Sequence, residues 1–141
     1  MKKFVFELED VLSFRKIEQQ QAEAELAKAL AAEREVQNMI DSLAMQQIKT
    51  AKSMEGSTDF LAIAQANEFY GFIRAKTEEL LSEITKLKVI SDEKREKLRL
   101  CMQRSESLEK LKEKQKEDFI SFQKKAEAKE IDNIVTSRFQ K

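Results

Sequence analysis

The feature that most constrains the fold is an apolar stripe in steps of three and four residues, which starts close to the first residue. The stripe runs through Val5, Leu8, Leu12, Arg15, Gln19, Ala22, Leu26, Ala29, Glu33, Val36, Ile40 and Leu43. Nine of these twelve positions are apolar, and the alternation of three and four never slips. Such spacing keeps one face of a helix against a partner helix along its whole length, as in a coiled coil.

The composition agrees with long helices. The 141 residues include no proline and two glycines, and 37% of them are charged. A chain with so few helix breakers has almost nowhere to turn. We therefore expect an all-α protein, a long antiparallel two-helix coiled-coil hairpin that forms a single domain over residues 1–141.

The one convincing break is the segment 54–59, with the sequence MEGSTD. Gly56 can take a positive φ and stop a helix, and Ser57, Thr58 or Asp59 can cap the next one. The sequence therefore predicts a first helix over about 3–52, a loop over about 54–59 and a longer second helix over about 60–139. A second break at 91–93 is the alternative.

The second predicted helix carries its own stripe, with a register slip between Leu80 and Ile84 and another after Leu108. The stripe comprises Phe69, Ile73, Lys76, Leu80, Ile84, Leu87, Ser91, Lys94, Leu98, Cys101, Ser105 and Leu108, and continues through Leu111, Gln115, Phe119, Phe122 and Ala126. Cys101 lies on this stripe, so we expect a small buried hydrophobic side chain there rather than a reactive thiol.

A short loop predicts that the helices fold back on each other. If the turn centres near residue 57, the numbers of paired residues sum to about 114, and Val5 lies opposite the region of Glu109. The last thirty or so residues then overhang as a single helix. Residues 110–141 hold nine basic and six acidic side chains, a net charge of +3. This segment either folds onto a neighbour or docks into a partner.

Two aromatic groups have alternative roles. Phe4 and Phe6 either staple the start of the first helix against Leu108 and Leu111 or form part of a partner-binding tip.

The second aromatic group is the cluster Phe69, Tyr70 and Phe72, whose side chains leave a helix in three directions. At least one of them must be exposed. Gly71 within the cluster allows close approach of a partner. We favour an exposed contact site over packing within the hairpin.

The composition argues against several function classes. There is no histidine, no glycine-rich phosphate loop and no cysteine pair, so we expect no catalytic, cofactor or metal site. A net charge of zero argues against nucleic acid as a partner. No apolar run approaches the roughly 20 residues of a membrane span, and we expect no direct membrane insertion. Acidic residues interrupt the start where a secretion signal needs an apolar stretch. The single cysteine has no partner for an internal disulfide, which suits a reducing cytosol, so we expect a cytoplasmic protein.

Three segments together resemble the flagellar export protein family FliJ. They are Phe4-x-Phe6-x-Leu8-x-x-x-Leu12-x-x-Arg15-x-x-Glu18 running into AEAELAKA, Phe69-x-x-Phe72-Ile73, and Glu130-Ile131-Asp132-Asn133-x-x-x-x-Arg138-Phe139. The resemblance implies a hairpin similar to the γ-stalk of rotary ATPases, without enzymatic activity. It implies a stalk at the cytoplasmic side of the cell membrane at the flagellar base, which couples the export ATPase ring to the membrane export gate and binds export chaperones.

The resemblance also implies contact residues. Phe72 matches a family position tied to the export gate, and we expect its neighbours Phe69 and Tyr70 to support it. The family's end with both termini enters the ATPase ring, and there we predict contacts by Phe4, Phe6, Phe119, Phe122, Arg138 and Phe139. Competing hypotheses are a virulence type III secretion stalk, a prefoldin-like chaperone with β-hairpins between its helices, and a parallel dimeric tether.

Overall fold

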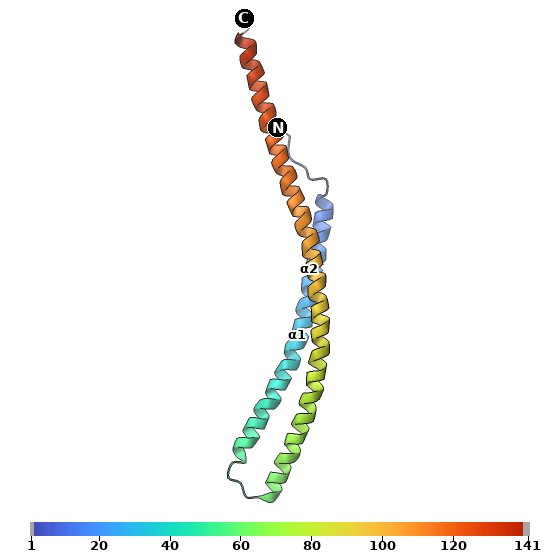
Figure 1. Ribbon diagram of the computed structural model, residues 1–141, viewed down its shortest axis with the longest axis vertical. Coiled ribbons are helices and arrows are strands. Elements are labelled where there is room, and N and C mark those ends of the chain that lie inside the picture. Colours follow the sequence, from blue (N-terminus) through green and yellow to red (C-terminus); the bar gives the residue numbers. More distant parts are fainter. Residues whose placement is uncertain (1, 140–141) are drawn as a thin grey trace. The chain divides into compact units, whose positions relative to one another are not determined.

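The computed structural model describes residues 2–139 and contains two helices (Figure 1). Helix α1 spans Glu9–Ser53 and helix α2 spans Phe60–Phe139, and no strand occurs within residues 2–139. The helices pack against each other as an antiparallel hairpin, which confirms the predicted fold class. The chain divides into two compact units, one formed by residues up to Gln20 with those from Arg99 onward, the other by Gln21–Leu98. Helix α2 runs without a break through Ser91, so the alternative of a second break is wrong.

The first helix starts later than predicted. It begins at Glu9 rather than near Lys3, and the preceding residues 2–6 lie outside any helix. The amide of Glu9 donates to the carbonyl of Phe6 at 3.1 Å and closes the turn into α1. Glu9 and Asp10 in the first turn place negative charge at the positive end of the helix dipole.

The loop between the helices forms as its residue types predict. Gly56 has a φ of 71° and is the one glycine with a positive φ among the described residues. The side chain of Asp59 caps α2, because its Oδ1 accepts a hydrogen bond from the amide of Leu61 at 3.0 Å. These two residues explain why α1 ends at Ser53 and α2 begins at Phe60.

In the unit formed by Gln21–Leu98, an apolar cluster holds the helices together. Val36, Leu80 and Ile84 are buried, and Ile40, Leu43 and Leu87 pack against them. Ser91 is 1% exposed and its hydroxyl donates to the carboxylate of Glu33 across the seam. Within this unit the two helices diverge toward the loop, and the start of α2 extends past the end of α1 (Figure 1).

The other unit has a similar seam. Leu12, Phe6 and Cys101 are its buried apolar side chains, at 2%, 5% and 5% exposure. The expected burial of Cys101 is therefore confirmed. Ser105, at 3% exposure, donates to Gln19 Oε1 at 2.6 Å. An ion pair of 2.8 Å between Lys112 and Glu9 flanks the seam.

The predicted helix register is wrong by about ten residues. Ser91 donates a hydrogen bond to Glu33, and Ser105 donates one to Gln19. The residue numbers of each pair sum to 124, whereas the predicted sum is 114. Glu109 forms its ion pair with Lys16, at 3.1 Å, and does not face Val5. The error arises because the turn is not symmetric: the first residues of α2 extend past the last turn of α1 (Figure 1).

The predicted stripes match the burial along most of both helices. Every stripe position from Leu12 to Leu43 and from Phe69 to Leu108 is buried or half-buried. The predicted burial of Val5 and Leu8 is wrong: they are 77% and 38% exposed, because they precede α1.

The slip predicted after Leu108 is also wrong. Leu111, Gln115, Phe122 and Ala126 are exposed, and of the predicted continuation only Phe119 is half-buried. After Leu108 the half-buried positions are instead Lys112, Phe119 and Gln123. The next stripe position is therefore Lys112, four residues after Leu108, and not Leu111.

The overhang is shorter than predicted. Gln123 Nε2 donates to the carbonyl of Lys2 at 3.1 Å, and all side chains over residues 124–139 are exposed. The overhang therefore begins after Gln123 rather than near Lys110. Non-helical residues cover up to about 3.3 Å each against 1.5 Å in a helix, so the segment before Glu9 reaches farther along α2 than a helix would.

Candidate functional site

The three aromatic residues near the start of α2 have different environments. Phe72 is 60% exposed, whereas Phe69 and Tyr70 are half-buried. Ile73, the next residue, is 2% exposed and occupies the seam. The prediction that at least one aromatic ring must face solvent is confirmed, and the exposed one is Phe72.

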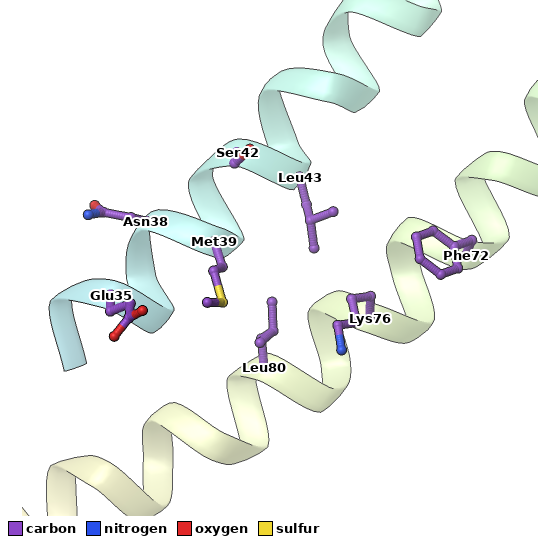
Figure 2. A pocket seen from close by; sticks show the side chains of 8 residues that line it. All are labelled: Glu35, Asn38, Met39, Ser42, Leu43, Phe72, Lys76 and Leu80. Atoms are coloured by element: carbon purple, nitrogen blue, oxygen red, sulfur yellow. The ribbon is translucent and has the colours of Figure 1, made fainter. Parts of the chain in front are cut away.

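Phe72 borders a groove between the two helices, which we call the loop-end groove (Figure 2). Its volume is about 500 Å³. The lining residues are Glu35, Asn38, Met39, Ser42, Leu43, Phe72, Lys76 and Leu80. Figure 2 shows Met39 and Leu43 pointing from α1 toward α2, and Leu80 pointing from α2 toward them. Apolar side chains therefore floor the groove, and polar ones lie on its rim.

The α1 wall of this groove was not predicted. Leu43 lies on the apolar stripe, but Met39 falls between the stripe positions Val36 and Ile40 and is 46% exposed. The sequence signal for this wall was the apolar side chain of Met39 outside the stripe. Single apolar side chains on a helix surface are common, so this signal is weak.

The residues predicted to contact the ATPase ring are divided between packed and exposed positions. Phe4 and Phe119 form a ring pair with centroids 5.7 Å apart, and Phe6 is 5% exposed. Phe122 and Phe139 are 74% and 86% exposed, and Arg138 is also exposed.

The packing of Phe4 and Phe6 supports the interpretation that they staple the start of the chain to α2. The ring partner, however, is Phe119 rather than Leu108 or Leu111. This difference follows from the corrected register and from the non-helical course of residues 2–6.

Beyond Gln123, α2 carries an apolar face that nothing in the described chain covers. Ile131, Ile134, Val135 and Phe139 are 62%, 54%, 44% and 86% exposed. Residues three and four apart share a face of a helix, so the four side chains form one patch. We call residues 124–139 the C-terminal segment. The sequence shows its apolar residues, but only the structure shows that the paired region ends before them.

Residues 2–139 contain no cluster of histidine, cysteine or carboxylate side chains that could hold a metal ion. The pKa of Glu25 lies below its ordinary value, because Lys97 and, next in effect, Lys94 donate hydrogen bonds to its carboxylate. Glu25 lies 3.1 Å from Lys97 and 3.3 Å from Lys94 in an exposed ion-pair group. Neither helix has a stretch within residues 2–139 long and apolar enough to span a membrane.

A hairpin of two long helices with exposed apolar surfaces defines the chain as a coiled-coil protein. Its sequence matches the model of one family, described as flagellar FliJ protein, over residues 4–141. The chain therefore belongs to the FliJ family, whose members are non-catalytic components of the flagellar export apparatus. Comparisons with the curated proteins and with the solved structures gave no match.

Proposed function

We propose that the chain is the stalk that couples the export ATPase ring to the membrane export gate, and that it also binds export chaperones. Its place would be on the cytoplasmic side of the cell membrane at the flagellar base. The observation that carries this proposal is the C-terminal segment, which is helical to Phe139 and exposed at every side chain. Isolated helices of this length are marginal in water, and an apolar face on one favours a covering partner.

The ATPase ring is the partner we assign to the C-terminal segment. The exposed Phe122 and Phe139 supply aromatic anchors, a residue type found often at the energetic centres of interfaces. The packed residues Phe4 and Phe6 would act indirectly, because they hold the start of the chain against α2 near Phe119.

Binding of the purified export ATPase tests this assignment. The double variant Ile131→Ser with Val135→Ser should weaken binding by at least about tenfold, because it removes the centre of the apolar patch. The control Ile48→Ser alters a side chain that is similarly exposed, at 50%, but lies in the other unit. Unchanged ATPase binding by the double variant would move the docking site elsewhere.

The export gate is the partner we assign to Phe72, with Phe69 and Tyr70 as its support. Phe72→Ala should weaken binding of the cytoplasmic part of the gate protein about thirtyfold, as expected for a hot spot of about 2 kcal/mol. Helicity and ATPase binding should hardly change, because the ring is 60% exposed. Phe14→Ala is the matched control, since Phe14 is 56% exposed. If Phe72→Ala instead loses helicity, and the fraction that remains folded still binds the gate protein, Phe72 is a structural residue.

The competing hypotheses receive less support. A prefoldin-like chaperone needs β-hairpins between its helices, and residues 2–139 contain no strand. The family match is to a flagellar protein, which favours flagellar over virulence export. Loss of motility on deletion of this chain, and co-purification of export chaperones with it, are the expected results in cells.

A further inference from the structure

We infer that the loop-end groove takes an amphipathic α-helix of a partner protein, with its apolar face on the groove floor and basic residues along its flanks. This inference rests on the proposed function, because Phe72 belongs to both. It extends that function from one aromatic ring to a site formed by both helices, and it specifies the chemistry of the occupant.

The dimensions of the groove suit side chains from one face of a helix. Its volume of about 500 Å³ is within the range of specific ligand sites and has room for several large side chains. The floor is closed by Leu80, at 4% exposure, and the site opens at Phe72 and Met39, at 60% and 46%. A helix lying in such a groove presents anchors three, four and seven residues apart. Met39 is flexible and can adapt to their shape.

A helical occupant also agrees with the hydrogen-bonding groups available. Both walls of the groove are α-helices, whose backbone groups bond within their own helix. An extended peptide would find no sheet edge there and would leave its own backbone groups unpaired against an apolar floor. A helix satisfies its backbone internally, so an amphipathic helix can cover the floor at a lower desolvation cost.

The charges around the groove favour basic flanks. The face of α2 that presents Phe72 continues with Lys76, Glu79 and Glu83, at helical spacing, and Glu35 lines the α1 wall. These four charged residues sum to −2, and the ion pair of 3.5 Å between Lys76 and Glu79 joins one charge of each sign. The surrounding segment, residues 35–83, contains eight acidic and four basic side chains. A basic flank would therefore meet attraction, whereas an acidic one would meet like charge.

Two synthetic helical peptides test the inference on the full-length protein. Both carry the same leucine face, and their flanks bear lysine in one peptide and glutamate in the other. Fluorescence anisotropy should show the lysine peptide binding at least about tenfold more tightly than the glutamate peptide at low salt, with the difference shrinking as salt is added. Equal binding of the two peptides would overturn the charge argument.

Variants then locate the binding site. Met39→Gln and Glu35→Gln should each weaken the lysine peptide several-fold, whereas Met45→Gln should leave it unchanged. Met45 is the matched control because it is 55% exposed on α1 and does not line the groove. Circular dichroism checks that each variant stays folded. An unchanged affinity in Met39→Gln would show that the peptide binds elsewhere, and the groove assignment would be wrong.

The same variants separate this inference from the proposed function. If Phe72→Ala abolishes gate binding but Met39→Gln and Glu35→Gln do not affect it, the gate contact stands and the groove inference falls. If the lysine peptide binds the groove as expected while Phe72→Ala leaves gate binding intact, the gate assignment falls instead.

Discussion

The buried hydrogen bond between Ser91 and Glu33 allows a quantitative test of what holds the helices in register. Ser91 is 1% exposed, and its hydroxyl lies within bonding distance of the Glu33 carboxylate and of the Lys88 carbonyl, the latter at 3.0 Å. A hydroxyl has one proton, and an ionised carboxylate only accepts. The bond across the seam therefore uses that proton, and the Lys88 carbonyl is the alternative acceptor within α2.

The expected energies follow from this arrangement. A hydrogen bond to a charged group contributes roughly 1.5–3 kcal/mol. Glu33 is half-buried, so its carboxylate can turn to water when the hydroxyl is removed, and we expect Ser91→Ala to cost about 1.5 kcal/mol. Glu33→Ala should cost less, because Ser91 can then donate to Lys88. The coupling energy between the two substitutions should be about 1 kcal/mol.

Urea unfolding followed by circular dichroism measures each variant and the double variant. Ser107→Ala is the control, because the exposed Ser107 hydroxyl donates to the carbonyl of Gln103 on its own helix, at 2.8 Å. The control should stay within about 0.5 kcal/mol of the unmodified protein. A coupling energy below about 0.3 kcal/mol between Ser91 and Glu33 would refute the argument that this pair stabilises the register.

The remaining predictions concern an exposed ion-pair group and the two glycines. The pKa of Glu25, lowered from 4.5 by Lys97 and Lys94, should rise toward that value in Lys97→Gln, as measured by NMR titration of the carboxyl group. Because the folded-state pKa is depressed, the contribution of Glu25 to stability should be present above pH 4.5 and be lost as the pH falls through the folded-state pKa. Gly56→Ala should destabilise the protein by about 1 kcal/mol, because its φ of 71° strains an L-residue. Gly71→Ala should stabilise by about 0.5–1 kcal/mol, because the added methyl group in a helix interior would meet no atom within 4 Å apart from its chain neighbours and the helix's own backbone. Thermal shifts of the same sign for the two glycine variants would contradict this pair of predictions.

The helices and their inward faces could be predicted because the signal is local. Burial of one helix face repeats every three or four residues, and no knowledge of the partner is needed to see it. The same pattern misled at the start of the chain, where the stripe continued through Val5 and Leu8. Phe4 and Phe6 alternate there with exposed residues, which is the spacing of an extended segment. The sequence does not show this alternation, because Val5 between the two phenylalanines is itself apolar.

The loop-end groove could be predicted only in part. Three aromatic residues in one helical turn cannot all enter a seam, so exposure of one of them follows from the sequence. The position of Met39 across the groove from Leu80 (Figure 2) depends on how far α1 is displaced along α2, and on the separation of the helices toward the loop (Figure 1). Periodicity identifies the faces that meet and contains no information on this displacement.

The register itself had a signal in the sequence, carried by polar residues in the stripes. Gln19 and Glu33 are fourteen residues apart, as are Ser91 and Ser105. Fourteen residues are two heptads, so an antiparallel pairing that joins Gln19 to Ser105 also joins Glu33 to Ser91. The structure contains this pairing, with both bonds on one register. Small side chains such as Ala22 and Ala29 would tolerate sliding of one helix along the other. Any displacement would separate both polar pairs at once and leave the two serines, at 1% and 3% exposure, without their partners on α1. Matched polar positions in a mainly apolar seam therefore specify the register that the apolar stripe alone leaves open.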